Sequence, residues 1–437
     1  MKKMILLFVL GFAFICGAAE KPKYLFLFIG DGMSVPQRMA AEEFARSQGR
    51  QLVLNNMPVS GTTRTSSANA LVTDSAAAAT AIACGTKTKN GALGVDADGK
   101  PVESMAYVAK KAGYKVGIIT SVDLNHATPG GFYAHRASRG EGYNICIDLV
   151  DSGFDFFAGG KPFHRDDKKH PNYKGHLWNF AAKAGYKVVR GADGLASLSK
   201  GDGKVLMVSN GSRISPAIDG GDPGADLHDM VAKGIELLDN PNGFFMMVEG
   251  GAIDWAGHGN NAAENLQELL ALDKAVQVAV EFAKKHPAET LIVVTGDHET
   301  GGMTVGFAGV GHKLNLALLG HQKISNGKFG EMVKKEKWTF EETKPQLTKY
   351  FGLQFSGNDP MTLSEKELQV LEEEFNNGKI ADALRKVMND KAGVSWSSGG
   401  HSSMPVLTTS MGCGAENFTG FFENTDIAKR FKALMQQ

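Results

Sequence analysis

Cysteine is scarce in this sequence: the 437 residues contain four, and Cys16 lies in the N-terminal segment. The other three, Cys84, Cys146 and Cys413, have spacings that fit no zinc knuckle, and three thiols form at most one disulfide. This scarcity excludes a small fold held together by disulfides and a metal site built from thiolates. An exported chain of this kind depends on its apolar core or on metals bound by other side chains.

An excess of charge of one sign is also absent, because 47 Lys and Arg balance 47 Asp and Glu. A nucleic-acid-binding protein needs an electropositive face, so no nucleic-acid partner is expected. No stretch after the N-terminal segment is long and apolar enough to be a membrane helix, so no membrane span is expected. The composition, 43% hydrophobic and 22% charged, is that of a globular protein with a large core.

The N-terminal segment has the pattern of a secretory signal peptide. Two lysines precede the apolar run 4–15, which is too short to span a bilayer, and small residues follow it. Removal of residues 1–19 would leave a mature chain, 20–437, in the periplasm or outside the cell. A lipid anchor on Cys16 is the alternative, but the bulky residue before it makes a poor lipobox, so cleavage by signal peptidase is favoured.

Apolar runs alternate with helical patterns along most of the chain. Residues 24–29, YLFLFI, are typical of a strand buried on both faces. This alternation predicts an α/β fold with a large, mainly parallel central sheet flanked by helices on both faces. Residues 61–70, rich in Thr, Ser and small residues, are predicted to form a loop. Further strands are predicted at 114–120, 187–189, 244–248 and 290–295.

The pattern changes late in the chain. Residues 311–395 are charged and helical, with amphipathic stretches at 363–375 and 380–389. Because apolar residues recur at helical spacing, we interpret this region as a cap or insertion in one domain that spans 20–437, not as a linker.

Ser75 lies at the start of an alanine-rich run, 76–83, which predicts a helix because alanine is the strongest helix former. The N–H groups and the dipole at a helix N-terminus attract anions, so this hydroxyl would lie beside an anion site. On this stretch alone, an N-cap role for Asp74 or Ser75 is the simpler interpretation. The rest of the chain favours a chemical role.

Carboxylate and imidazole side chains follow the ends of predicted strands, where α/β proteins place functional groups. Asp254 and His258 are four residues apart, so a helical turn puts both on one face. Imidazole and carboxylate without thiolate suit zinc, and carboxylates with hydroxyls suit magnesium. The inventory suits more than one divalent cation and consists of Asp31, Glu249, Asp254, His258, Asp297, His298 and His401.

These motifs together resemble those of the alkaline phosphatases, which are metal-dependent phosphomonoesterases. The resemblance implies an exported enzyme that hydrolyses small phosphate monoesters through a phosphoserine and releases inorganic phosphate. Family members are often homodimers, so a homodimer is implied as well. The matching segments follow the family's order and span nearly the whole mature chain: Gly30-Asp31-Gly32-Met33, Thr73-Asp74-Ser75-Ala76, Ala127-Thr128-Pro129, 134–139, 249–258, 295–299 and Gly400-His401.

The resemblance also implies a role for each matched residue. Ser75 is the implied nucleophile. Arg139 is implied to bind the phosphate, and Asp74 is implied to position Arg139. Arg136 is the competing candidate for the role of Arg139. The implied metal sites are a zinc ion on Asp254, His258 and His401, a second zinc ion on Asp31, Asp297 and His298, and a third metal, usually Mg²⁺, on Asp31, Thr128 and Glu249.

Two positions depart from the best-known bacterial pattern of the family. His126 stands where an aspartate is often found, and Trp255 stands where a lysine is often found. A histidine at the first position either ligates the third metal or weakens magnesium binding, so the identity of that metal stays open. An indole at the second position cannot supply the charge through which a lysine attracts phosphate.

Two alternative functions stay open. A phosphodiesterase or nucleotide pyrophosphatase of the same superfamily commonly uses threonine as nucleophile and lacks the third-metal residues, so Ser75, Thr128 and Glu249 favour the monoesterase. A non-catalytic phosphate- or metal-binding protein has no need of an intact nucleophile.

Trp255→Lys is predicted to tighten inhibition by inorganic phosphate, because a cation at this position attracts the anion through water. The inhibition constant against p-nitrophenyl phosphate should fall about fivefold, the size of a solvated charge pair. An unchanged constant in a variant that keeps its turnover would contradict the placement of Trp255.

Overall fold

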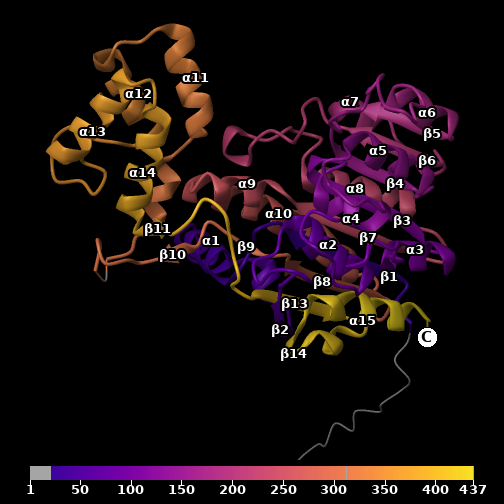
Figure 1. The fold of residues 1–437 in the computed structure, drawn as a ribbon. Helices are drawn as coiled ribbons and strands as arrows, with labels where there is room; N and C mark the ends of the chain where they lie inside the picture. The colour runs from indigo at the N-terminus through magenta and orange to yellow at the C-terminus, as the bar shows by residue number, and fades with distance from the viewer. Residues whose placement is uncertain (1–20, 312, 437) are drawn as a thin grey trace, which may run out of the picture.

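The computed structural model describes residues 21–311 and 313–436. The expected signal peptide therefore lies outside the described residues. Figure 1 shows a body in which helices surround a central sheet, with a helical lobe that projects from it. The predicted α/β class is confirmed, because one ten-stranded, mostly parallel sheet has an apolar core on each face. Among the described helices, none has the length and apolarity to cross a membrane.

The large sheet has the strand order β14-β2-β13-β8-β1-β7-β3-β4-β6-β5. Two small antiparallel pairs, β9–β12 and β10–β11, lie outside it. The strands are β1 (Tyr24–Gly30), β2 (Val59–Arg64), β3 (Lys115–Asp123), β4 (Phe156–Gly160), β5 (Tyr186–Arg190), β6 (Lys204–Val208), β7 (Phe244–Gly250), β8 (Thr290–Gly296), β9 (Glu299–Thr300), β10 (Met303–Val305), β11 (Val394–Trp396), β12 (His401–Ser402), β13 (Val406–Gly412) and β14 (Gly420–Glu423).

Helices connect most of these strands. The α-helices are α1 (Val35–Ser47), α2 (Ser75–Cys84), α3 (Met105–Lys111), α4 (Ala127–Tyr133), α5 (Gly142–Asp151), α6 (Leu177–Lys183), α7 (Gly191–Ala196), α8 (Leu227–Leu238), α9 (Ala252–His258), α10 (Ala262–Ala283), α11 (Asn326–Glu336), α12 (Phe340–Phe351), α13 (Glu365–Asn376), α14 (Ile380–Ala392) and α15 (Asn424–Gln436). Short 3₁₀ turns are η1 (Val53–Asn55), η2 (Ala217–Asp219), η3 (Leu316–His321) and η4 (Ala415–Phe418).

The central strands β1, β7 and β8 are buried along their whole length, as their apolar sequences require. Strand β1 pairs in parallel with both neighbours, so Gly30, Gly250 and Gly296 stand in one row at the carboxyl end of the sheet. The chain leaves all three strands at the same edge. This register brings together side chains that are far apart in the sequence.

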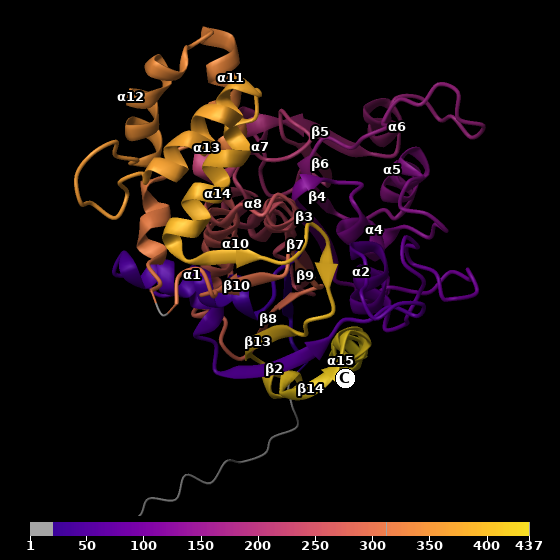
Figure 2. The same cartoon turned by 60° about the vertical axis from the view of Figure 1, so that its left-hand side comes forward.

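Alternate residues of β1 enter two different cores. Phe26 and Phe28 pack with α1, α8 and α10 on one face, whereas Leu25 and Leu27 pack with α2, α3 and α15 on the other. Figures 1 and 2 show β13, β14 and α15, from the end of the chain, beside β2 from its beginning. Strand β13 alone runs against its neighbours in the large sheet.

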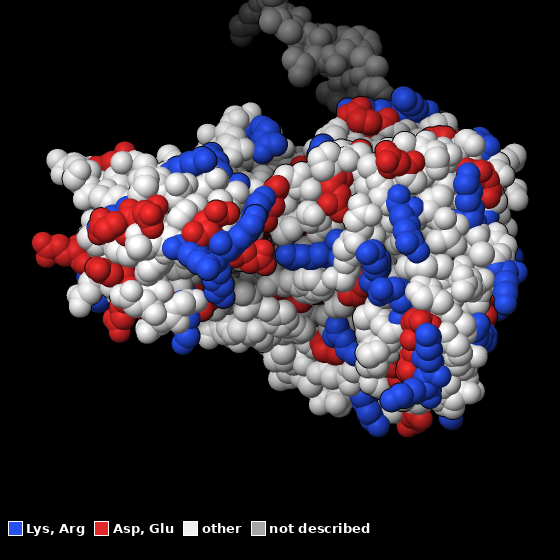
Figure 3. Space-filling model, turned by 90° about the horizontal axis from the view of Figure 1, so that it is seen from above, with Lys and Arg blue, Asp and Glu red and all other residues white. Residues whose placement is uncertain are grey.

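The lobe contains η3 and α11 to α14 and lies in sequence between β10 and β11. Its amphipathic helices α13 and α14 agree with the helical stretches expected from the sequence. Its interior includes Phe329, Leu347 and Leu384, all fully buried, and this apolar cluster continues into the core beneath α10. Figure 3 shows charges of both signs interspersed over the face seen from above, in keeping with the zero net charge.

Arg38 of α1 is a fully buried cation with no carboxylate within ion-pairing distance in the described chain. Its guanidinium donates to Asn55 Oδ1 at 2.8 Å, Leu54 O at 2.6 Å, Leu407 O at 3.0 Å and Thr409 Oγ1 at 3.1 Å. These bonds join α1 to η1 and β13. Because burial of a charge is costly without such partners, Arg38 fixes the packing of these three elements.

Arg38→Met is expected to lower the free energy of unfolding by about 3 kcal/mol, because buried acceptors lose a charged donor while the stem keeps its volume. Urea unfolding followed by fluorescence measures the change. Arg50→Met is the matched control, since the Arg50 side chain is exposed and donates only to Gln48. Equal stability of the two variants would refute a structural role for the Arg38 network.

Candidate metal centre

The carboxyl edge of the central strands carries the polar side chains that the sequence singled out. Asp31 follows β1, Glu249 is the penultimate residue of β7, and Asp297 and His298 follow β8. Two residues after β7 ends, α9 begins and carries Asp254 and His258. Strand β12 pairs with β9, opposite Thr300, and so brings His401 to the same edge.

A first group consists of Asp254, His258 and His401, whose nearest ligand atoms all lie within 4.8 Å of one another. The Nε2 atoms of the two histidines are 3.3 Å apart, and His258 Nε2 is 3.3 Å from Asp254 Oδ2. Each Nδ1 lies against a backbone carbonyl, at 2.7 Å for His258 and 2.8 Å for His401. Because Nδ1–H donates there, both Nε2 atoms are available to one cation.

A second group consists of Asp31, Asp297 and His298, all fully buried. His298 Nε2 is 3.3 Å from Asp31 Oδ1 and 3.3 Å from Asp297 Oδ2. The hydroxyl of Ser75 reaches the same point, because its Oγ is 3.2 Å from His298 Nε2. Three ligand atoms and one hydroxyl therefore converge.

A third group consists of Asp31, His126 and Glu249. His126 Nδ1 is 3.9 Å from Asp31 Oδ2 and 3.7 Å from Glu249 Oε1. Thr128, on α4, donates from Oγ1 to Asp31 Oδ2 at 3.3 Å. Asp31 thus contributes one oxygen to the second group and the other oxygen to the third.

The electrostatics of the site call for cations. Burial, reinforced by neighbouring carboxylates, raises the pKa values of Asp31 and Asp297 well above their usual range. Burial lowers the pKa of His298, whereas the hydrogen bond with Asp254 raises the pKa of His258 to about 9. Buried atoms without a hydrogen-bond partner face the groups: Asp31 Oδ1, Asp297 Oδ2, Glu249 Oε1 and His126 Nδ1.

These buried, unpartnered atoms indicate that the site fits metal ions. A buried carboxylate without a partner is strongly unfavourable, and a divalent cation removes that penalty. The donors are imidazole nitrogens and carboxylate oxygens with no thiolate, which suits zinc in the first two groups. The third group, richer in oxygen, also suits a harder cation such as magnesium.

Ser75 is the first residue of α2, and Asp74 is its N-cap, accepting from Ala77 N–H at 3.0 Å. Helix α2 packs closely on α4, where a side chain on Gly131 would clash with Ala79. This close approach explains the small residues on both helices. It also fixes Ser75 relative to Thr128 at the start of α4.

Arg139 lies on the loop after α4 and faces the site. Its Nη1 is 3.4 Å from Asp74 Oδ2, and its Nη2 is 3.0 Å from His126 Nε2. Arg136, the competitor, instead donates from Nε to Asp148 Oδ2 at 2.8 Å. The two arginines do not share a helix face, because residues 134–141 are not helical.

Trp255 is half-buried beside the third group. Its ring meets that of His126 in a T-shaped arrangement with 6.2 Å between centroids. The guanidinium of Arg213 lies over the ring of Trp255, 5.3 Å from the ring centroid.

Sequence reasoning missed Thr300, which joins two groups. Its hydroxyl donates to Asp254 Oδ1 at 2.5 Å and lies 3.2 Å from His298 Nδ1. His298 Nδ1–H can donate to it, which leaves His298 Nε2 free for a cation. The available signal was the spacing, because residues two apart in extended chain share a face.

Glu299 was also missed. It is fully buried and accepts hydrogen bonds from Gln37 Nε2 at 2.7 Å and from Ser402 Oγ. It therefore holds β9, which begins just after His298, and β12, which carries His401, against α1.

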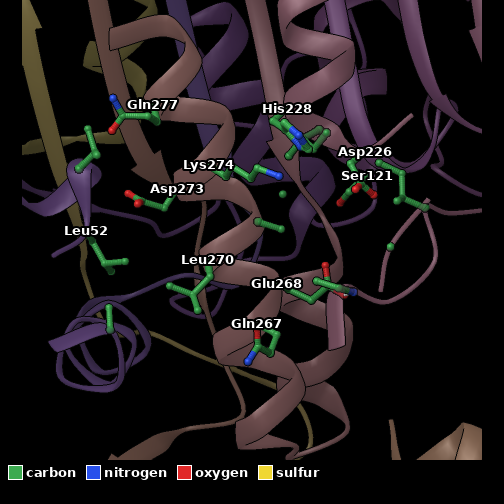
Figure 4. A pocket seen from close by; sticks show the side chains of 18 of the residues that line it. Leu52, Ser121, Asp226, His228, Gln267, Glu268, Leu270, Asp273, Lys274 and Gln277 are labelled. Atoms are coloured by element: carbon green, nitrogen blue, oxygen red, sulfur yellow. The ribbon is translucent and has the colours of Figure 1, made fainter. Parts of the chain in front are cut away.

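A cavity of about 550 Å³ lies apart from these groups and contains none of their residues. Figure 4 shows Glu268 and Lys274 of α10 on one side of it, with Asp226 and His228 across from them. Asp226 caps α8, so its cluster with His228 and Asp229 has a structural explanation.

Comparison with known proteins identifies relatives over nearly the whole chain. The alkaline phosphatase family matches residues 22–437. Alkaline phosphatase 3 of Bacillus subtilis is 30% identical, with 96% of this chain and 90% of that protein covered. The structure of a cold-active alkaline phosphatase from a psychrophilic Shewanella has a TM-score of 0.84 at 29% identity, covering 95% of this chain and 100% of that one.

A third relative has been solved with a metal bound. The alkaline phosphatase of the Antarctic bacterium TAB5 has been solved as a histidine-to-aspartate mutant with Mg bound in its M3 site. That structure is 26% identical with a TM-score of 0.69, and covers 96% of this chain and 99% of its own.

Thr300→Val is expected to weaken zinc binding about 10- to 100-fold, because valine keeps the shape of threonine but removes the hydroxyl between Asp254 and His298. Equilibrium dialysis of the metal-free protein against zinc measures the affinity. Thr300→Ser keeps the hydroxyl and should bind zinc as the unchanged protein does. If the valine variant also binds zinc unchanged, the hydroxyl does not orient the ligands.

Proposed function

The chain belongs to the alkaline phosphatase family and is a phosphatase, and from this premise we propose that it hydrolyses phosphate monoesters through a phosphoserine formed on Ser75. The observation that carries the proposal is the position of Ser75 Oγ, 3.2 Å from His298 Nε2 at the meeting point of buried metal-ligand atoms. A hydroxyl beside such a group and at a helix N-terminus suits attack on a phosphate.

The proposal assigns three cations to the three groups. The third site includes Thr128 besides Glu249 and Asp31, and its identity as Mg²⁺ is the expectation from the family. His126 reaches the third group with an unpartnered Nδ1, which favours a ligating role in this chain. The two zinc sites are formed by Asp254, His258 and His401, and by Asp31, Asp297 and His298.

When bound, two neighbouring divalent ions lower the pKa of the serine hydroxyl and stabilise charge on the attacking and leaving oxygens. The residues of the chain do the rest. Ser75 Oγ loses its proton to solvent and forms a bond to phosphorus, while the ester oxygen leaves and takes a proton to become the alcohol. Water then attacks phosphoserine from the opposite side, the Ser75 Oγ–P bond breaks, and the hydroxyl is restored as phosphate departs.

Arg139 and α2 bind the phosphoryl oxygens in this scheme. The guanidinium of Arg139 offers a planar pair of donors, and its contact with Asp74 orients it. Asp74 accepts from Ala77 N–H with its side chain and from Ala78 N–H with its carbonyl, so the N–H groups of Ser75 and Ala76 are available to the anion. Asp74 thus combines the capping role and the positioning role that the sequence left as alternatives.

Location and assembly belong to the same proposal. We expect cleavage of residues 1–19 and export to the periplasm or beyond the cell, with the lipid anchor at Cys16 less favoured. The region 311–395, which contains the lobe, is assigned as an insertion in the catalytic domain. The homodimer stays a prediction. The phosphodiesterase or pyrophosphatase alternative is not favoured, because the named relatives are alkaline phosphatases.

Ser75→Ala is expected to lower kcat/KM for p-nitrophenyl phosphate by about 1,000-fold or more, because the attacking oxygen is lost. Removal of metals by a chelator should abolish turnover of the unchanged protein, and added zinc should restore it. Ser199→Ala removes an exposed hydroxyl from the segment between α7 and β6 and should leave the rate unchanged. Full turnover in Ser75→Ala would refute the proposed mechanism.

A further inference from the structure

Arg213 carries a guanidinium that nothing in the described chain neutralises. Its side chain makes no hydrogen bond and no ion pair within residues 21–311 and 313–436, and its guanidinium lies over the face of Trp255, 5.3 Å from the ring centroid. The side chain is half-exposed. Burial raises the pKa values of Glu264 and Glu268, and the charge of Arg213 opposes this rise, yet neither carboxylate forms an ion pair with Arg213. All five N–H donors are therefore available to a ligand.

Arg213 adjoins the metal centre through the ring of Trp255. Trp255 adjoins Asp254 on α9, and the other neighbour of its ring is His126 at 6.2 Å. His126 in turn lies 3.0 Å from Arg139. Arg139, His126, Trp255 and Arg213 thus form a continuous series along one side of the site, with a guanidinium at each end.

The backbone holds Arg213 in place. The next residue, Ile214, donates from its N–H to Ser121 O at 2.9 Å, and Ser209 Oγ donates to Arg213 O at 3.3 Å. The hydroxyl of the same Ser121 accepts from Gly251 N–H at 2.9 Å, at the start of α9. One residue therefore anchors both the Arg213 loop and the helix that carries Trp255, which limits their relative movement.

We propose that Arg213 and Trp255 form a second anion subsite, which makes the enzyme prefer phosphate monoesters that carry another anionic group, a carboxylate or a second phosphate. The inference rests on the proposed function of the metal centre. Arg139 binds the phosphate that reacts, and Arg213 binds the anionic oxygens of the leaving group. The indole excludes water from one face of the guanidinium, which strengthens its pairing with an anion.

The test compares phosphoglycerate with glycerol phosphate, which differ by a carboxylate in place of a hydroxymethyl group. Arg213→Gln keeps polar, planar contact with the indole but removes the charge. We expect it to lower kcat/KM for phosphoglycerate about tenfold, through KM, while glycerol phosphate changes less than about twofold. Arg213→Lys should retain part of the preference. Lys274→Ala removes an unpaired, exposed cation from the cavity of Figure 4 and should leave both substrates unchanged.

Binding is measured without turnover by competitive inhibition with phosphonoacetate and methylphosphonate, of which only the first has a carboxylate. Arg213→Gln should weaken phosphonoacetate alone. An equal fall in kcat/KM for both substrates, with equally weakened binding of both inhibitors, would mean that Arg213 only supports α9. The subsite would also be refuted if neither the ratio of the two kcat/KM values nor the ratio of the two inhibition constants changed. Failure of the unchanged, zinc-loaded protein to hydrolyse any monoester would instead refute the proposed function.

Discussion

Repulsion among buried carboxylates is the constraint on which the rest of the structure depends. Asp31, Glu249, Asp254 and Asp297 are all at most 4% exposed and stand at one edge of the sheet. No arginine or lysine forms an ion pair with any of them in the described chain. Such a set is stable only when cations are bound or when some of the carboxyls are protonated, as the raised pKa values of Asp31 and Asp297 indicate. The large apolar core on both sheet faces offsets this local cost.

Backbone carbonyl groups orient the candidate ligand atoms of two histidines. His258 and His401 each present Nε2 to the site because Nδ1 faces a carbonyl, of Gly399 and Thr73 respectively. Thr73 lies two residues before Ser75, so β12, which carries His401, is hydrogen-bonded to the loop that leads into Ser75. Movement of the Ser75 loop would therefore disturb His401 as well. The positions of Ser75 and His401 are therefore coupled through the backbone at Thr73.

The sequence predicts the strongly patterned elements and misses those set by tertiary contacts. The apolar run 24–29 is a strand because it is buried on both faces, and the alanine-rich run after Ser75 is a helix. The prediction of a loop over 61–70 was partly wrong, because β2 extends through Arg64. Its Thr and Ser residues gain hydrogen bonds only once β13 and β14 lie beside it. No local sequence pattern in this segment indicates that strands from the far end of the chain will pair with it.

The site shows the same division between local pattern and tertiary context. The ligand residues stood out because chemistry-bearing side chains followed predicted strands, and the family resemblance grouped them. The choice between Arg136 and Arg139 required the structure, because it depends on the hydrogen bond from Arg136 to Asp148. Arg213 and Thr300 had no motif, because each acts through a neighbour from another element.

The way the lobe is attached has a consequence for the site. Its two ends leave the body through paired strands, β10 with β11, just beyond the β9–β12 pair that carries His401. The distance between His298 and His401 is thus independent of how much chain lies between those strands, and closing a longer loop costs little. Evolution is free to lengthen, shorten or replace the lobe while the chemistry beneath it stays the same.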